Sequence, residues 1–294
     1  KPNAIFASNT STLPITDIAA NAAHPENVVG MHFFNPVDRM PLVEVIRGQK
    51  TSDEAAVTVA DFARKLGKTV VYCNDGPGFI VNRILGPYMN ESGFLLEEGN
   101  ATLSIDRAMV DFGMPMGPMA LLDEVGIDVA AKVGDILAKS FADRMSARSR
   151  VVDVLYADGR YGKKNGKGLY LYENGKRKGP DGSVYKLLGV TPHPADAKNV
   201  VERTILAMIN EAAMILDEKI AGSAEELDLA MIMGTGFPPF RGGLLRYADT
   251  LGSQSIVNRL DDLSARLGPR FAATPPMRRL AMNDGKFYAT YVRR

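Results

Sequence analysis

The sequence predicts an α/β structure followed by a mostly α structure, whose helical part forms two tandem, duplicated domains. Up to about Asn74, short apolar runs alternate with segments of helical periodicity, which is typical of strands that alternate with helices. From Phe79 onward, apolar residues recur at spacings of three and four, which is the pattern of packed helices. An ordered series of matching motifs across the helical part indicates a duplication.

The α/β part is expected to contain strands at residues 5–7, 28–34, 42–46 and 69–72. Pro14 suits the first turn of a short helix that ends near Ala20, because proline fixes φ near its helical value. Thr51 and Glu54 have the spacing of a capping box, which predicts a longer helix from there to about Leu66.

The helical part is expected to begin with helices over residues 80–98, 105–112 and 118–141. Residues 174–198 are rich in Gly, Pro, Lys and Asp, which predicts a linker between the two helical copies. In the second copy, Ser223 and Glu226 supply another capping box.

The duplication is read from pairs of motifs whose separation changes slowly along the chain. Asn90-Glu91 matches Asn210-Glu211 at a separation of 211 − 91 = 120, and Asp106 matches Asp228 at 228 − 106 = 122. Gly113 matches Gly236 at 236 − 113 = 123, and Leu121-Leu122 matches Leu244-Leu245 at 244 − 121 = 123. Such a drift is expected where loops between helices take insertions. We therefore expect each copy to bury its apolar face against the other.

Composition excludes several classes of protein. The chain has 294 residues, a hydrophobic fraction of 46% and a net charge of +1, so it can bury ordinary cores and has no basic surface suited to nucleic acid. Cys73 is the only cysteine, which predicts a reducing compartment, the cytoplasm, and no internal disulfide. No apolar run approaches the ~20 residues of a membrane span. One cysteine and three scattered histidines offer no metal-ligand spacing.

The segment from Gly30 to Ile46 carries the clearest chemical signal. His32 ends one apolar run, Glu44 lies early in the next, and the residues between them favour a turn. Two strands joined by such a turn would bring the imidazole and the carboxylate face to face. The carboxylate would fix the tautomer, so that the other ring nitrogen accepts a proton near neutral pH. The alternative is a core histidine bonded to a backbone carbonyl.

Six motifs follow one another over essentially the whole chain. They are Ser8-Asn-Thr-Ser-Thr-Leu13, Gly30-Met-His-Phe-Phe-Asn-Pro36, Leu42-Val-Glu-Val45, Gly76-Pro-Gly-Phe-Ile-Val-Asn-Arg83, Gly113-Met-Pro-Met-Gly-Pro118 and Gly236-Phe-Pro-Pro-Phe-Arg-Gly-Gly243. As an ordered set they resemble the L-3-hydroxyacyl-CoA dehydrogenase family. The tandem helical domains resemble most closely the dehydrogenase portion of the multifunctional α-subunits of bacterial fatty-acid oxidation complexes.

This resemblance implies a fold, a reaction and a partner. Residues 1–75 would be the C-terminal half of a Rossmann-type NAD-binding domain, and residues 76–177 and 178–294 would be the two helical dehydrogenase domains. The implied reaction is the NAD-dependent oxidation of L-3-hydroxyacyl-CoA to 3-oxoacyl-CoA in fatty-acid β-oxidation. The implied ligands are NAD and an acyl-CoA thioester, and the implied protein partner is a thiolase β-subunit.

The resemblance also implies roles for four catalytic residues. His32 would be the general base that takes the proton from the substrate 3-hydroxyl, and Glu44 would orient it. Ser11 would hydrogen-bond the reacting oxygen and lie beside the nicotinamide, and Asn82 would hold the substrate near its thioester carbonyl. Without the resemblance, Ser11 and Asn82 are equally well explained as residues that cap helices.

The same resemblance implies three further contacts, of which those of Lys164 and Tyr247 are the weaker candidates. Asn35 and Lys164 would contact the cofactor, and Tyr247, from the second copy, would contact the substrate. Lys164 lies in a Gly/Lys-rich turn that could be simply solvated, and Tyr247 could be core packing.

The chain departs from the family in one motif. A dinucleotide site needs G-x-G-x-x-G between a strand and a helix, but Gly76-Pro-Gly78 lacks the third glycine and Gly234-Thr-Gly236 lacks a preceding strand. The chain starts at Lys1 without methionine and enters a strand-like run almost at once. We therefore expect the pyrophosphate-binding half, and a hydratase domain before it, upstream of Lys1. The piece alone is expected to bind NAD weakly and to be weakly active or inactive.

Two other functions compete with the leading one. A short-chain 3-hydroxybutyryl-CoA dehydrogenase would use the same residues, and the second helical copy argues against it. A non-catalytic module that binds acyl-CoA or docks a subunit would keep the fold without the reaction.

Overall fold

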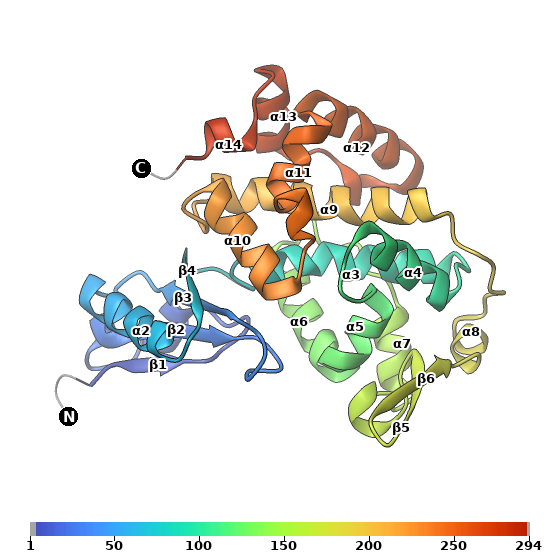
Figure 1. Cartoon of the computed structure of the whole chain (residues 1–294), viewed down its shortest axis with the longest axis horizontal. Helices are drawn as coiled ribbons and strands as arrows, with labels where there is room; N and C mark the ends of the chain where they lie inside the picture. Colours follow the sequence, from blue (N-terminus) through green and yellow to red (C-terminus); the bar gives the residue numbers. More distant parts are fainter. Residues whose placement is uncertain (1–3, 293–294) are drawn as a thin grey trace. The chain divides into compact units, whose positions relative to one another are not determined.

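The computed structural model describes residues 4–292, so Lys1 lies outside the described residues. The chain forms two compact units (Figure 1). The first unit contains residues 1–84, 209–262 and 272–294, and the second contains residues 85–208 and 263–271. Each unit therefore takes segments that are distant in the sequence, and each is described by itself.

The first unit contains a mixed four-stranded sheet in the order β1-β2-β3-β4. The strands are β1 (Phe6–Ser8), β2 (Val28–Phe33), β3 (Leu42–Arg47) and β4 (Thr69–Asn74). β1 and β2 are parallel, β2 and β3 antiparallel, and β3 and β4 parallel. All four expected strands are confirmed, with bounds that differ by at most two residues. The antiparallel pair β2–β3 is the hairpin predicted around the turn after His32.

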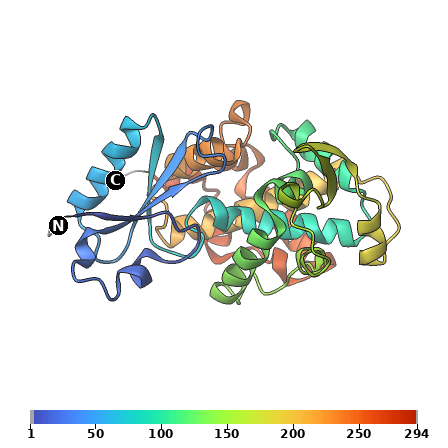
Figure 2. The ribbon, with the colours of Figure 1, turned by 90° about the horizontal axis from the view of Figure 1, so that it is seen from below.

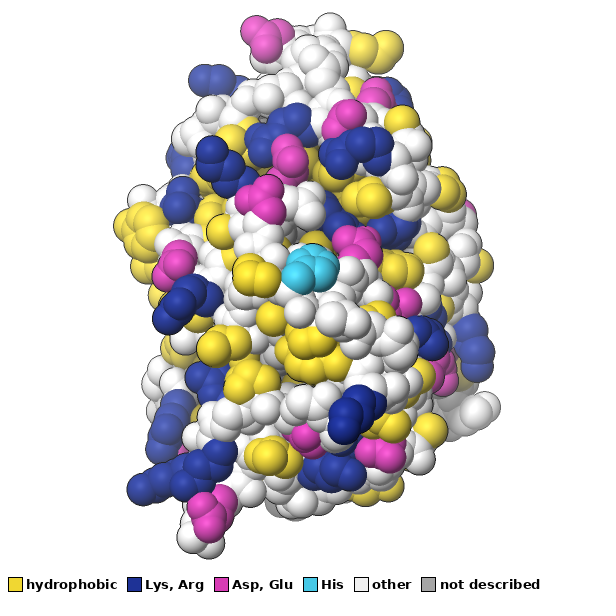
Figure 3. All heavy atoms as spheres, turned by 90° about the vertical axis from the view of Figure 1, so that its right-hand side faces the viewer, with side chains coloured by type: hydrophobic (Ala, Val, Ile, Leu, Met, Phe, Trp, Pro, Cys, Tyr) yellow, Lys and Arg dark blue, Asp and Glu magenta, His cyan; other side chains and the backbone are white. Residues whose placement is uncertain are grey.

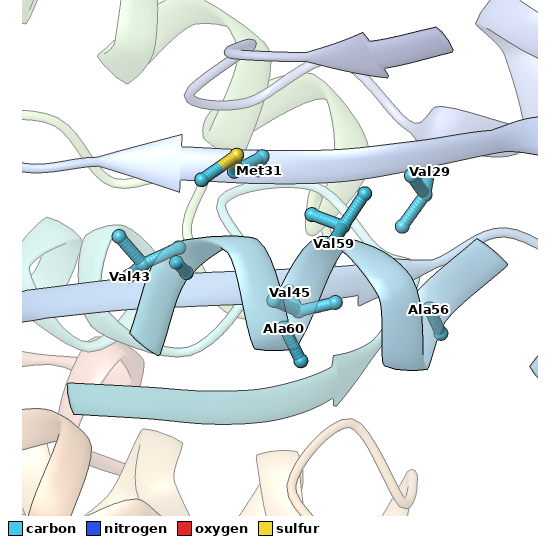
Figure 4. Close-up of a cluster of buried hydrophobic side chains, with 8 residues drawn as sticks. Val29, Met31, Val43, Val45, Ala56, Val59 and Ala60 are labelled. Carbon is cyan, nitrogen blue, oxygen red and sulfur yellow. The ribbon is translucent and has the colours of Figure 1, made fainter. Parts of the chain in front are cut away.

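One face of this sheet is covered by α2 (Asp53–Lys65), which lies along the strands (Figure 2). The buried cluster between them takes alternate residues of the two central strands and one face of the helix (Figure 4). Its members are Val29, Met31, Val43, Val45, Ala56, Val59, Ala60 and Ala63. Successive strand side chains point to opposite faces. His32 and Glu44, which alternate with these residues, therefore point to the face away from α2.

The start of α2 differs from the predicted capping box. The N-cap is Ser52, whose hydroxyl oxygen accepts a hydrogen bond from the Ala55 amide, so the prediction for Thr51 and Glu54 was wrong. The Thr51 hydroxyl is already engaged, because it donates to the Val28 carbonyl and accepts from the Gly48 amide. The second predicted cap is confirmed at Ser223, which accepts from the Glu226 amide at 3.2 Å.

The first unit also contains short elements beside the sheet and most of the second helical copy. The short elements are α1 (Ile15–Ala19) and η1 (Pro25–Asn27). The later elements are α10 (Ala224–Thr235), η3 (Pro239–Arg241), α11 (Leu244–Leu251), α13 (Pro275–Met282) and α14 (Phe287–Thr290). Three long helices, α3 (Val81–Glu97), α9 (Ala197–Asp217) and α12 (Ser253–Leu267), have residues in both units.

The second unit holds the first helical copy. Its elements are α4 (Thr102–Phe112), α5 (Pro118–Val125), α6 (Ile127–Ser140), α7 (Val151–Ala157), η2 (Lys163–Asn165), β5 (Tyr170–Glu173), β6 (Lys176–Pro180), α8 (Ser183–Leu188) and η4 (Pro269–Phe271). The expected single helix over 118–141 is broken at Gly126, whose φ of +101° is incompatible with a continuous helix.

The segment predicted as a linker, residues 174–198, was only partly a linker. It contains β6, which pairs antiparallel with β5, and α8. The buried Arg160 guanidinium explains this order, because it donates to Asp181 and Ser183 within the segment and to Asp158 outside it. The composition of the segment alone does not show that its oxygen atoms accept hydrogen bonds from the buried Arg160.

The duplication is confirmed by matching buried hydrogen bonds. In the first copy, the Asp106 carboxylate accepts from the amides of Met119 and Ala120, at 2.8 and 3.0 Å, and from the Tyr170 hydroxyl at 2.7 Å. The carboxylate thus caps α5. Burial is the largest influence on its pKa and raises it.

In the second copy, Asp228 does the same for α11. It accepts from the amides of Leu245 and Arg246, at 2.7 and 2.9 Å, and from the Tyr288 hydroxyl at 2.8 Å. Met119 therefore corresponds to Leu245, a separation of 245 − 119 = 126. The predicted match of Leu121 with Leu244 was wrong, because three extra residues lie in the loop before α11.

Two buried arginines exchange partners between the copies. In the first unit, Arg83 of α3 donates to Glu211 of α9 at 2.6 Å. In the second unit, Arg203 of α9 donates to Glu91 of α3, also at 2.6 Å. The arginines are 203 − 83 = 120 residues apart, and the glutamates are 211 − 91 = 120 apart. Each copy thus supplies one arginine and one glutamate.

The surface is of mixed charge on the face that Figure 3 shows, where basic and acidic side chains are interspersed among apolar ones. Across residues 4–292, no helix is both long and apolar enough to cross a membrane. In the same part of the chain, no group of three or more His, Cys, Asp or Glu side chains is placed to hold a metal ion.

Candidate active site

A buried imidazole–carboxylate pair lies on the two central strands. His32 of β2 and Glu44 of β3 are direct cross-strand partners in the antiparallel register. Opposite residues in such a register have neighbouring side chains, and here the His32 Nδ1 atom lies 2.7 Å from Glu44 Oε2. His32 is 3% exposed and Glu44 is fully buried. The predicted pairing across the turn is confirmed.

The second oxygen of Glu44 is held by the start of a helix. Glu44 Oε1 accepts hydrogen bonds from the amides of Val81, at 3.0 Å, and Ile80, at 3.3 Å. These amides lie at the N-terminal end of α3, where unpaired N–H groups and the helix dipole favour a negative charge. Glu44 is therefore fixed from both sides as a carboxylate, and its other oxygen accepts the Nδ1 proton of His32. The Nε2 atom of the ring is left to accept a proton.

Aromatic rings surround the imidazole. The ring centre of Phe34 lies 4.5 Å from that of His32, and the ring centre of Phe79 lies at 5.8 Å. Phe79 has a φ of +50° in the turn before α3, which places its side chain in the core. An apolar surround strengthens the interaction between the imidazole and the carboxylate. A carboxylate, and not a backbone carbonyl, is the partner of this histidine, so the alternative of a plain core histidine was wrong.

The structure brings Asn82 and Ser11 to the same part of the first unit. Asn82 follows Val81, whose amide binds Glu44, and its side-chain amide donates to the Ser11 carbonyl at 3.1 Å. The Ser11 loop is also held by Asp75, whose two oxygens accept from the amides of Ile15 and Thr16 at 2.8 and 2.7 Å. The loop after β1 is thus fastened to the starts of α1 and α3.

Asn35 lies just beyond the end of β2 and is exposed. The Asn9 side chain accepts a hydrogen bond from the Phe33 amide at 2.9 Å, which holds the ends of β1 and β2 together. Because β1 and β2 are parallel, the loops that carry Ser11 and Asn35 leave the sheet at the same edge.

The two weaker candidates lie elsewhere. Lys164 belongs to the second unit, where it forms an ion pair with Asp128. The hydrogen bond from Lys164 is the largest cause that lowers the pKa of Asp128. Tyr247 is half-buried on α11 in the first unit, with the Arg241 guanidinium 5.1 Å from its ring centre. Within the first unit, the structure therefore groups His32 and Glu44 with Asn82 and Ser11.

Sequence reasoning missed the groups that hold this site in place. They are the backbone amides of Ile80 and Val81, the carboxylate of Asp75 and the side chain of Asn9. Asp75 directly follows β4, where a polar residue at the end of a buried strand is a recognisable signal. The amides carry no side-chain signal, and the turn Gly76–Phe79 was their only trace in the sequence.

The mixed sheet, the buried His32–Glu44 pair and the duplicated helices are together the features of a dehydrogenase. Sequence comparison assigns the chain to one family of these enzymes. A profile described as the NAD binding domain of 3-hydroxyacyl-CoA dehydrogenase matches residues 1–76. A profile for the C-terminal domain of the same enzyme matches residues 78–172 and 200–290, that is, both helical copies. The chain belongs to the 3-hydroxyacyl-CoA dehydrogenase family.

Within this family, the chain is most similar in sequence to proteins of one kind among the relatives compared. The chain is 51% identical over 287 residues to the fatty acid oxidation complex subunit alpha of Shewanella amazonensis, covering 97% of this chain and 40% of that protein. It is 48% identical over 289 residues to the protein of the same name from Vibrio cholerae, covering 98% and 41%. The chain thus spans about two fifths of the length of the relatives it matches.

Solved structures show the same fold. The 3-hydroxybutyryl-CoA dehydrogenase of Escherichia coli K12 matches with a TM-score of 0.82 and 28% identity, over 97% of this chain and 76% of that chain. The dehydrogenase part of a multifunctional enzyme from C. elegans matches with a TM-score of 0.65 and 26% identity, over 95% and 65%. The first match covers both helical copies, so the second copy does not by itself argue against a short-chain enzyme.

Proposed function

We propose that this chain is the dehydrogenase part of a fatty acid oxidation complex α-subunit. It would catalyse the NAD-dependent oxidation of L-3-hydroxyacyl-CoA to 3-oxoacyl-CoA. The main support for the proposal is the buried His32–Glu44 pair. It is a hydrogen-bonded imidazole and carboxylate, suited to acid–base catalysis, on the sheet of a domain that matches the dehydrogenase family. The roughly 50% identity to α-subunits favours this substrate class over the short-chain one.

The residues present fit the nicotinamide end of the cofactor. Ser11 and Asn35 are exposed polar residues in the loops after two parallel strands, β1 and β2. Ligands of open α/β sheets bind outside the carboxyl ends of parallel strands. NAD supplies the hydride acceptor that no protein side chain offers. Ser11 and Asn35 would hold it there, and we retain Lys164 as a proposed cofactor contact.

Each reactive group then has one task. His32 Nε2 accepts the proton of the substrate hydroxyl while the hydrogen on the same carbon leaves as hydride. Glu44 stabilises the imidazolium that forms, and positioned acid–base catalysis of this kind contributes ~10²–10⁴-fold. Ser11 donates to the reacting oxygen, Asn82 holds the thioester carbonyl, and Tyr247 contacts the substrate from α11. These contacts fix the orientation on which hydride transfer depends.

The proposal extends to the organisation of the protein. The division into residues 1–75, 76–177 and 178–294 is supported by profile matches that begin and end near these bounds. A thiolase β-subunit as partner and a cytoplasmic location are proposed because the relatives are named subunits of a fatty acid oxidation complex.

The test is the His32→Gln variant of the protein at its natural length, assayed by NADH formation from 3-hydroxyacyl-CoA. We expect kcat to fall by ~10²–10⁴-fold, with a small change in KM. His24→Gln, at an exposed histidine of the same unit, is the matched control and should retain full activity. A native protein without turnover would support the docking module instead. Activity measured on a series of substrates from short to long acyl chains decides between the 3-hydroxyacyl-CoA dehydrogenase of an α-subunit and a short-chain 3-hydroxybutyryl-CoA dehydrogenase.

A further inference from the structure

The loop that joins α10 to α11 begins against the active-site strands. A Cβ atom at Gly234, near the end of α10, would meet the side chain of Leu42 at 2.8 Å and that of Val81 at 3.0 Å. A larger residue at position 234 would require the Leu42 side chain to shift. Leu42 lies two residues before Glu44 on β3, and the Val81 amide binds Glu44. The second helical copy therefore packs the end of α10, which the loop of residues 236–243 follows, against the strand and the helix start that hold Glu44.

This loop is fixed at both ends and is longer than its counterpart in the first copy. It is three residues longer than the corresponding loop before α5, where Gly113 and Gly117 occupy the places of Gly236 and Gly243. At its end, a Cβ atom on Gly243 would lie 2.3 Å from the buried Asp228 carboxyl carbon, and the φ of Gly243 is +111°. Both ends are thus anchored, and the extra residues form a fixed projection.

The projection presents an aromatic ring and a cation. Phe240 is 74% exposed, although Phe237 and Pro238 of the same loop are buried. The Arg241 guanidinium lies 5.3 Å from the ring centre of Phe240 and 5.1 Å from that of Tyr247. A guanidinium held against two rings keeps its planar donors aligned, and such an arginine suits bidentate binding of phosphate.

We propose that Phe240 and Arg241 bind the nucleotide part of coenzyme A, Arg241 through a phosphate and Phe240 by stacking on the adenine. This rests on the proposed function, because it assigns that substrate's far end to the second helical copy. A large exposed aromatic ring beside a positioned arginine matches a ligand that carries both a base and phosphates. The chemistry at His32 does not require either residue, so both act in binding.

The experiment compares two substrates in the protein at its natural length. The first is a 3-hydroxyacyl-CoA, and the second is the same acyl group on pantetheine, which lacks the nucleotide. For Arg241→Gln and Phe240→Ala, we expect KM for the CoA thioester to rise about ten-fold or more. We expect kcat and the KM for the pantetheine thioester to stay as in the native protein. Calorimetric titration with coenzyme A alone should show the same loss of affinity.

Arg278→Gln is the matched control, because Arg278 is an exposed arginine of the same unit that pairs with Asp261. It should change neither KM. Equal losses with both thioesters would show that the loop only supports the fold, and an unchanged affinity for coenzyme A would overturn the proposal. A native protein that binds coenzyme A through Arg241 but turns over neither thioester would refute the dehydrogenase and leave this site standing.

Discussion

Replacing Glu44 by glutamine removes one charge from the buried pair and leaves its shape. In the native pair, Oε2 accepts from His32 Nδ1 at 2.7 Å, and Oε1 accepts from the amides of Val81 and Ile80. Glutamine offers a single acceptor oxygen, so either the imidazole or the helix amides lose their partner. A buried donor without a partner costs about 1–3 kcal/mol.

The catalytic effect should exceed the structural one. Opposite charges about 4 Å apart attract by about 4 kcal/mol at an effective dielectric constant of about 20. In the proposed reaction this attraction forms only when His32 takes the substrate proton, so it would act on the transition state. At ~1.4 kcal/mol for each factor of ten, its loss corresponds to about 10³-fold in rate. Because the glutamine dipole retains part of the interaction, we expect kcat to fall by ~10²–10³-fold.

The assay is NADH formation under saturating substrate, with urea unfolding measured on the same preparations. Glu54→Gln makes the same chemical change at an exposed position on α2 and should leave both kcat and the free energy of unfolding unchanged. If Glu44→Gln stays folded and retains kcat within about three-fold, the carboxylate does not stabilise the imidazolium and the reasoning about this pair is refuted.

Three further predictions concern charge and pH. Burial raises the pKa of Asp228 from 3.8 to about 6, so its protonated form stabilises the fold below about pH 4 and this contribution is lost as the pH rises through about 6; the urea-unfolding difference between the native protein and Asp228→Asn should change by about 3 kcal/mol over that range, and a constant difference would contradict the shift. Glu91→Gln removes the charged partner of Arg270 and one of the two carboxylate partners of the buried Arg203, which keeps Glu98, so it should lower the free energy of unfolding by about 1–3 kcal/mol, whereas an unchanged free energy of unfolding would show that the pair is dispensable. Hydrogen bonds to two backbone carbonyl oxygens raise the pKa of His193 above 6.5, so its contribution to stability is complete below about pH 6.5 and disappears as the pH rises through the raised value; an NMR titration of the ring with a midpoint at or below 6.5 would contradict this.

Alternation and turn chemistry were enough to predict the hairpin that pairs His32 with Glu44. The period of two along β2 and β3 assigns His32 and Glu44 to one face, and the turn residues between them predict that the strands return. Ser11, in the loop after β1, and Asn82, at the start of α3, became candidates only through the family resemblance, because local pattern explains them equally well as capping residues. What brings Asn82 to the Ser11 carbonyl was not predictable, because that contact depends on tertiary packing that no local pattern encodes.

The errors have a common physical origin in groups that compete for a partner. Thr51 was predicted to cap α2, but its hydroxyl binds the Val28 carbonyl, and Ser52 takes the cap. The linker segment acquired structure because Arg160 needs oxygen partners there. The repeat offset in α11 was wrong because the two leucine pairs match only at an offset three residues short of the true one, whereas the buried Asp228 accepts hydrogen bonds from the amides at the true start of the helix.

The exchange of partners between the buried arginines restricts how this chain can be shortened or can diverge. Arg83 takes its carboxylate from the second copy, and the first copy gives Glu91 in return. A polypeptide ending before α9 would lack Glu211 and Arg203, so Arg83 and Glu91 would lose these partners. Only a second molecule could then supply the missing charges. A substitution at one member of either pair would therefore leave a buried charge without its partner unless the other member changed with it.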